Sequence, residues 1–227
     1  MAGMFLAASS VMFSWALRRR WLSINPAKGV KRPKLGAISK WPDRAIKDFL
    51  GSDPPQHLKL AFLMGLHTAQ RLGDIVRAKW VEIDLVKGLW TVTQSKTKMV
   101  VAVPLAHELR DALIMRMPIE GVQDGSGGEV YVLSRADGKP HNARLLSGEI
   151  SARMRGLGHK VTFHGLRKTA AIRLAEAGCS VSEIAAITGH KTLAMVQLYT
   201  REVDRSKLAQ HAMEKLNAQE NSSHPGT

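Results

Sequence analysis

Apolar side chains recur at helical spacing through most of the chain. In the segment PPQHLKLAFLMGLHTA, Leu58, Phe62 and Leu66 lie four positions apart, which places them on one face of a helix. The two prolines before them suit a helix start, where a missing backbone N–H leaves no bond unmade. The same periodicity predicts helices over 43–50, 106–116, 142–154, 165–177, 181–188, 192–198 and 203–217 and at the N-terminus, and residues 71–80 are expected to continue helically.

The period changes in the middle of the chain. Leu89–Thr93 and Val100–Val103 are short and rich in β-branched residues, and the polar segment QSKTKM separates them. Two such runs around a polar turn predict a β-hairpin. The run VYVL, residues 130–133, is expected to form a short buried strand. The expected fold class is therefore mainly α with a small antiparallel β-sheet, an α+β domain.

The N-terminal segment MFLAASSVMFSWALRRR predicts an amphipathic helix. Its arginines follow the apolar run, the reverse of a signal peptide, and the run is too short and too polar to span a bilayer. The next segment, residues 24–41, holds two prolines, two glycines and several lysines, so it is expected to be an extended basic linker. The tail from residue 220 is expected to be disordered.

The charge balance narrows the class of partner. The 227 residues include 33 Lys and Arg against 19 Asp and Glu, a formal net charge of +14. Such an excess favours a polyanionic partner, either nucleic acid or an anionic membrane surface. Because the cations are spread over the whole length, a folded basic face that binds nucleic acid is favoured over a polybasic membrane anchor, and no membrane partner is expected. One cysteine, Cys179, allows neither a disulfide framework nor a zinc cluster within the chain, and a reducing, intracellular setting fits.

Three sets of polar residues could carry chemistry, and each has an ordinary alternative. Arg71 and Asp74 share a face if the helix continues, so Asp74 could hold the guanidinium or cap the turn, although a surface ion pair is the commoner outcome. His164 and Arg167 lie on one face at a predicted helix start, where an anion would be stabilised, but this motif alone is weak. Lys96 and Lys98 at the hairpin turn could simply be solvated charges.

The segment SVSEIAAITGHKTLAMVQLYT contains the fourth set. Ser180 and Glu183 form a capping-box pattern, Gly189 is placed to end the helix, and His190 follows in the turn. Tyr199 lies at the end of the next helix, either as a core side chain or as a nucleophile. The two short helices of residues 181–199 also fit a helix-turn-helix, which would make the protein a DNA-binding regulator.

Taken in chain order, these sets resemble the active site of the tyrosine recombinases, the phage integrase family. The resemblance covers residues 37–217 and rests on the segments TAQRLGDIVRAKWVEIDL, QSKTKMVVAVPL, TFHGLRKTAAIRLAEAG and ITGHKTLAMVQLYTR. Asp74 stands where the family more often has Glu, and the same orienting role is expected. Family members carry a helical core-binding domain before the catalytic domain, and residues 1–36 resemble only its last helix and linker. The resemblance thus implies a catalytic DNA breaking-rejoining domain over 37–219 and a tail over 220–227.

The resemblance also implies a role for each candidate. Arg71 and Arg167 match the arginines that clamp the scissile phosphate, and His164 matches a proton acceptor or donor near the nucleophile. The remaining matches are His190 as a hydrogen-bond donor to a phosphate oxygen, Lys96 as the acid that protonates the leaving 5′ oxygen, and Tyr199 as the nucleophile. Lys96 is preferred to Lys98 because the family lysine lies just before an SKTG-type turn.

The implied function is site-specific DNA recombination by a prophage or mobile-element integrase, through a 3′-phosphotyrosyl intermediate like that of type IB topoisomerases. It needs neither a metal nor another cofactor. The implied partners are double-stranded DNA, three further copies of the chain in a tetramer on DNA, and accessory DNA-bending or directionality proteins, in the bacterial cytoplasm at the nucleoid. A catalytically silent integrase remnant is the other alternative.

Overall fold

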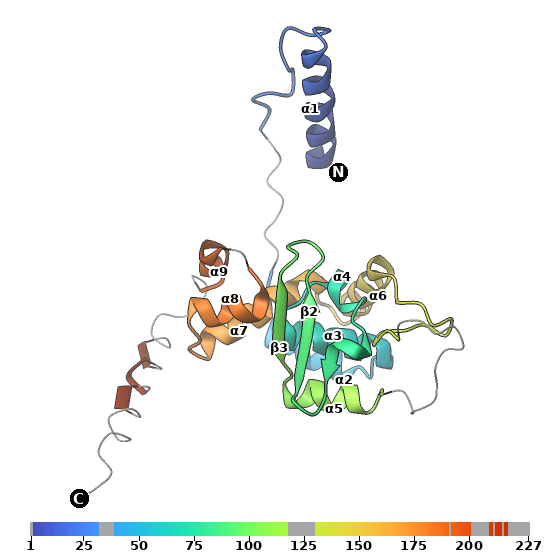
Figure 1. Ribbon diagram of the computed structural model, residues 1–227, viewed down its shortest axis with the longest axis vertical. Helices are drawn as coiled ribbons and strands as arrows, with labels where there is room; N and C mark the ends of the chain where they lie inside the picture. The colour runs from blue at the N-terminus through green and yellow to red at the C-terminus, as the bar shows by residue number, and fades with distance from the viewer. Residues whose placement is uncertain are drawn as a thin grey trace, which may run out of the picture. The chain divides into compact units, whose positions relative to one another are not determined.

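The computed structural model describes residues 2–31, 39–117, 130–190 and 192–200, with helical residues at 209–210, 212–214 and 216–217. The chain divides into two compact units, Met1–Ala37 and Ile38–Thr227 (Figure 1). Among the described residues, no helix combines the length and apolar character needed to cross a membrane.

The first unit is a helix with a folded-back turn. The helix α1 spans Ala2–Arg18, as the apolar pattern predicted. Asn25 donates hydrogen bonds from its amide to the Ser10 carbonyl at 3.0 Å and to the Ser14 hydroxyl at 2.9 Å, so the chain returns along the helix. Residues 26–29 form turns, and the expectation of an extended linker is wrong there. Most of the remaining linker, 32–38, lies outside the described residues.

The second unit is mostly helical and carries one small sheet, which confirms the expected fold class. Its helices are α2 (Asp43–Gly51), α3 (Gln56–Thr68), α4 (Leu72–Ile75), α5 (His107–Ile114), α6 (Ala143–Gly156), α7 (Phe163–Glu176), α8 (Val181–Thr188) and α9 (Leu193–Thr200), with a 3₁₀ turn at Trp80–Glu82. The strands β1 (Ile83–Asp84), β2 (Leu89–Thr93) and β3 (Val100–Pro104) form an antiparallel sheet in that order.

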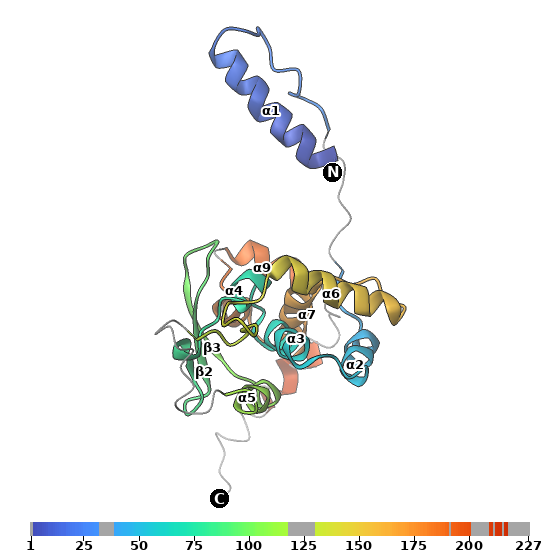
Figure 2. The same cartoon turned by 90° about the vertical axis from the view of Figure 1, so that its right-hand side faces the viewer.

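The β2–β3 hairpin has one buried face. Trp90 pairs with Val103, and Val92 with Val101, and all four side chains are buried. Because side chains alternate along a strand, Thr91 and Ala102 face the solvent. The hairpin turn lies at the opposite end of the sheet from α5 in both views (Figures 1 and 2).

Two glycines allow close packing around α7: Gly65 lets α3 approach it, and Gly165 lets the segment that contains Ser39 and Trp41 approach it. A Cβ on Gly65 would lie 2.8 Å from the Phe163 ring, and one on Gly165 would lie 2.6 Å from the Ser39 carbonyl oxygen. Both distances are too short for a real side chain, so only glycine fits. Trp41 and Phe49 pack beside this crossing against Phe62, with ring centroids 5.3 Å and 4.4 Å from it. The crossing fixes the first turn of α7 beside the C-terminal end of α3.

The structure corrects two expectations about local structure. Residues 71–80 do not continue helically, because α3 ends at Thr68 and Ala69 adopts a left-handed conformation with φ 54°. Arg71 is extended, and only Leu72–Ile75 of this segment is α-helical. The run VYVL is not a strand but a single bridge between Tyr131 and Lys79. The helix expected over 203–217 and the tail over 220–227 fall largely or wholly outside the described residues.

Candidate active site

Three of the predicted site residues meet at one pocket. Arg71 at the start of α4, and His164 and Arg167 on the first turns of α7, line a cavity of about 110 Å³ together with Gln70, Leu72, Ser147 and Phe163. That volume holds a few water molecules or one small anion. Arg71 and Arg167 are 96 positions apart in the chain, so tertiary structure makes the pocket.

Arg167 is the buried wall of this pocket. Its side chain is only 3% exposed. One guanidinium nitrogen donates to the Ala69 carbonyl at 2.6 Å, and another contacts Nε2 of His190 at 3.1 Å. The left-handed turn at Ala69 thus presents its carbonyl to Arg167. Burial, followed by the nearby charge of Arg71, lowers the pKa of Arg167 to about 10, so the group stays cationic at neutral pH.

His190 is a neutral acceptor in this arrangement. A guanidinium can only donate, so Nε2 of His190 must carry its lone pair toward Arg167. The ring proton is then on Nδ1, which lies 2.6 Å from the Thr188 hydroxyl, and Thr188 in turn donates to the Ile184 carbonyl at 2.7 Å. Burial first, and then the charges of Arg167 and Arg71, lower the pKa of His190 to about 4.

Tyr199 packs against this histidine. The two ring centroids are 5.6 Å apart, with the planes tilted by 49°. Tyr199 is half-buried at the edge of a small core that includes Ala171, Ile184 and Val196. A negative charge on Tyr199 would raise the pKa of the Arg167 guanidinium. The tyrosine is thus both a packed side chain and a neighbour of the cationic pocket.

Lys96 lies in the exposed turn between β2 and β3 and acts on the same site. Burial lowers the pKa of His164 first, followed by the charges of Arg167, Arg71 and Lys96. The charge of Lys96 is therefore felt at His164, although Lys96 is not among the residues that line the pocket. The preference for Lys96 over Lys98 remains a prediction, and this electrostatic contact supports it.

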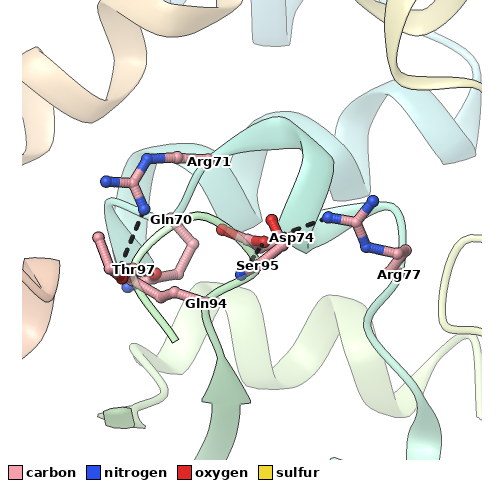
Figure 3. A network of polar contacts seen from close by, with 7 residues as sticks. All are labelled: Gln70, Arg71, Asp74, Arg77, Gln94, Ser95 and Thr97. Carbon is pink, nitrogen blue, oxygen red and sulfur yellow. Dashed lines mark hydrogen bonds and ion pairs between the residues drawn. The ribbon is translucent and has the colours of Figure 1, made fainter. Parts of the chain in front are cut away.

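Arg71 is held by an amide from the hairpin. Its guanidinium donates to Oε1 of Gln94 at 3.0 Å (Figure 3). The expectation that Asp74 could hold this guanidinium is wrong, because the helix does not continue through the two residues. The Asp74 carboxylate instead accepts from the Ser95 backbone N–H at 3.0 Å and lies 3.4 Å from Arg77 (Figure 3). Asp74 is 4% exposed, so it is a buried anchor for the hairpin and not part of a surface pair.

The predictions for the start and the end of α8 are confirmed. Ser180 and Glu183 form the predicted capping box, with bonds of 3.2 Å and 2.6 Å. Gly189 ends α8 in the left-handed conformation with φ 65°. The helix α9 has the sequence LAMVQLYT, without a cation, and it exposes Leu193, Met195 and Leu198. A recognition helix reads DNA through polar and basic side chains, so the structure does not favour the helix-turn-helix alternative.

Gln94, Thr188 and Ser147 were missed by the sequence reasoning. Gln94 and Thr188 are fully buried, and Ser147 on α6 lines the pocket. A glutamine directly before a polar hairpin turn gives no sign that it is buried. The position of Thr188 next to the Gly189-His190 pair was the only available signal.

Comparisons with known proteins agree on one family. A model of the phage integrase family matches residues 43–205. The chain is 30% identical over 203 residues to a shufflon-specific DNA recombinase of Escherichia coli, covering 86% of this chain and 49% of the relative. It is 32% identical over 182 residues to the integrase of Escherichia phage lambda, covering 75% of this chain and 47% of the relative. The chain therefore spans about half the length of these relatives.

Solved structures with a similar fold include members of the same family. A solved structure of a lambda integrase tetramer bound to a Holliday junction superposes with a TM-score of 0.69 at 24% identity, over 88% of this chain and 59% of that one. At this identity the superposition establishes the shared fold.

Proposed function

The chain belongs to the phage integrase family, and from this premise we propose that it cleaves and rejoins DNA strands at specific sites through a covalent bond to Tyr199. The observation that carries the proposal is the meeting of Arg71, His164 and Arg167 at one pocket, with Tyr199 packed against His190. A scissile phosphate in this pocket would be held by two guanidiniums beside the nucleophile.

The proposed reaction is a transesterification. The Tyr199 hydroxyl oxygen attacks the phosphorus, the bond from phosphorus to the 5′ oxygen breaks, and a 3′-phosphotyrosyl bond forms. Lys96 gives a proton to the departing 5′ oxygen, since an alkoxide is a poor leaving group. The tyrosine proton passes to a base, and His164 is the candidate because its lowered pKa leaves it largely neutral at pH 7. Attack by a 5′ hydroxyl reverses these steps and rejoins the strand without an energy source.

The arginines supply most of the electrostatic stabilisation. Negative charge grows on the nonbridging oxygens as the nucleophile adds, and fixed guanidinium donors stabilise that charge. Arg167 is already fixed by Ala69 and His190. In the free protein His190 accepts from Arg167, so donation by His190 to a phosphate oxygen would require a proton on Nε2. A bound phosphate favours this protonation because its charge raises the pKa of a neighbouring imidazole.

The proposed partners follow from charge and from the relatives. A net charge of +14 suits double-stranded DNA as the substrate. The lambda integrase forms a tetramer on a Holliday junction, and we propose the same assembly on DNA for this chain, with weak association or a monomer in its absence. Accessory bending or directionality proteins, and action at the nucleoid in the bacterial cytoplasm, complete the proposal for a prophage or mobile-element integrase.

The decisive experiment uses a suicide DNA substrate with a nick close to the cleavage site, so that the short released fragment diffuses away. The expected result is a covalent protein–DNA adduct that survives denaturation and is absent with Tyr199→Phe, which keeps the ring against His190. If the unaltered protein binds DNA but forms no adduct, the proposal is overturned. The protein would then be a catalytically silent integrase remnant. An adduct that persists in Tyr199→Phe would reassign the nucleophile.

A further inference from the structure

Gln94 lies at the centre of the polar network behind the candidate active site. Its side chain is fully buried at the end of β2. The amide nitrogen donates to Oε1 of Gln70 at 2.6 Å and to the Thr188 carbonyl at 2.9 Å. The amide oxygen accepts from Arg71 at 3.0 Å and from the Thr97 hydroxyl at 2.7 Å. A primary amide has two donors and two acceptor lone pairs, so these four bonds use its whole capacity.

The four partners belong to three separate parts of the site. Gln70 and Arg71 come from the loop between α3 and α4, and Thr97 comes from the turn that carries Lys96 (Figure 3). Thr188 ends α8 directly before the Gly189-His190 pair. Gly189 permits the last of these contacts, because a Cβ there would collide with the Gln94 amide. One side chain therefore joins the elements that carry Arg71, Lys96 and His190.

We infer that Gln94 is a positioning residue for DNA cleavage, which aims the Arg71 guanidinium at the scissile phosphate and couples it to the Lys96 turn and the His190 turn. The inference rests on the proposed function, since it concerns how the same pocket holds a phosphate. Arg71 is half-buried, and its guanidinium donates a hydrogen bond to Gln94, as Figure 3 shows. A long side chain with several rotatable bonds needs such a partner to keep one orientation. The amide orients Arg71 without neutralising it, whereas a carboxylate there would compete with the phosphate for the charge.

Two substitutions separate the orienting role of Gln94 from its lack of charge. Gln94→Met keeps the length but removes all four bonds, so Arg71 loses its orientation. Gln94→Glu keeps the acceptor for Arg71 and Thr97, removes both donors and adds a negative charge beside Arg71. Val103→Ala is the control, because it removes buried apolar contacts from β3 and destabilises the domain without touching the network. Comparison of melting temperatures shows whether the control and the variants are destabilised to a similar degree.

The experiment compares two suicide substrates in single-turnover adduct formation. One has a normal scissile phosphate, and the other has a neutral methylphosphonate that lacks one charged oxygen. If Gln94 positions Arg71, both variants slow cleavage of the phosphate by about tenfold or more and slow the methylphosphonate much less, since a neutral linkage needs less positive charge. Val103→Ala should affect the two substrates equally. Equal slowing of both substrates by the Gln94 variants, or no slowing, would show that Gln94 only stabilises the fold.

A second readout does not depend on cleavage. Arg71 is among the charges that lower the pKa of His164, so a displaced guanidinium in Gln94→Met should raise that pKa in an NMR titration of the free protein. An unchanged His164 titration in Gln94→Met would count against the inference. If the unaltered protein forms no adduct with either DNA, the proposed function fails, while this titration still decides whether Gln94 orients Arg71.

Discussion

The Arg71 region and the Arg167 region hold their guanidiniums by different means. Arg167 is 3% exposed and is fixed by a main-chain carbonyl and a histidine ring. Arg71 is half-buried and donates to the side chain of Gln94, whose position depends on three further bonds. The first arrangement is built into the meeting of α3 with α7, and the second into a hairpin turn.

The difference separates a fully buried guanidinium from a half-buried one that a single side chain holds. Burial of a charge is unfavourable unless it is well hydrogen-bonded, and the lowered pKa of Arg167 records that cost. The hydrogen-bond donors of Arg167 are held in place by Ala69 and His190. The hairpin turn that carries Lys96 and the Arg71 loop are linked through the Gln94 amide, so the orientation of Arg71 depends on the hairpin. Loss of Arg167 should therefore have larger effects than loss of Arg71.

The largest expected effect is on cleavage by Arg167→Lys. A lysine keeps the charge but cannot reach both Ala69 and the phosphate with a planar fork of donors, so single-turnover adduct formation should fall about a thousandfold. Arg71→Lys should reduce the rate about a hundredfold, because Arg71 is less buried and is held by one side-chain bond. DNA affinity measured in parallel should change little in either variant. A greater loss in Arg71→Lys than in Arg167→Lys would reverse the comparison.

Gly189→Ala should disturb both regions at once. The residue has φ 65°, and a Cβ there would strike the Gln94 amide while the next residue, His190, contacts Arg167. The strained backbone and the overlap together should lower the free energy of unfolding by about 3 kcal/mol, measured by urea denaturation. Gly88→Ala is a matched control, since it also has a positive φ of 65° but open space around it. Equal destabilisation by the two changes would mean that the contact with Gln94 is unimportant.

Acid should weaken the Arg167 region specifically. His190 has its pKa lowered from 6.5 to about 4, so between these values the unfolded chain binds a proton that the folded chain does not. Stability is then lost as the pH falls from 6.5 to 4, with no further contribution below 4, and the loss is about 2 kcal/mol after allowance for solvent screening. The free energy of unfolding at pH 7 and at pH 4.5 should differ less in His190→Gln. An identical pH dependence in that variant would show that the imidazole does not stay neutral.

The smallest expected effect compares the two threonines of the network. Thr188→Val removes a buried hydroxyl that serves both His190 and the Ile184 carbonyl, so it should cost about 1 kcal/mol of stability. Thr97→Val removes one bond to Gln94 from a half-buried position and should cost about half as much. Thermal denaturation of both variants tests the order. A larger loss in Thr97→Val would place the rigid part of the site at the hairpin.

Local sequence signals predicted the elements that depend on neighbours in the chain. The Ser180–Glu183 capping box and the left-handed Gly189 need only side chains within a few positions, and both are present. The β2–β3 hairpin was predicted from two short runs rich in β-branched residues around a polar turn, and the structure confirms it. The break after Thr68 could not be predicted this way, because apolar spacing runs through it and the carbonyl of Ala69 is satisfied by Arg167, 98 positions away.

The sequence by itself determined the family, the hairpin with its lysines, and the order of the candidate residues from Arg71 to Tyr199, because these depend on residue type and spacing. Tertiary structure alone decided which polar groups form hydrogen bonds with each other. Arg71 donates to Gln94, and Asp74 accepts from the hairpin backbone. The contacts of His190 with Thr188 and Arg167 set the tautomer of its ring. The physical reason is that a buried polar group must find its partner wherever the packing brings one, and sequence spacing does not record that distance.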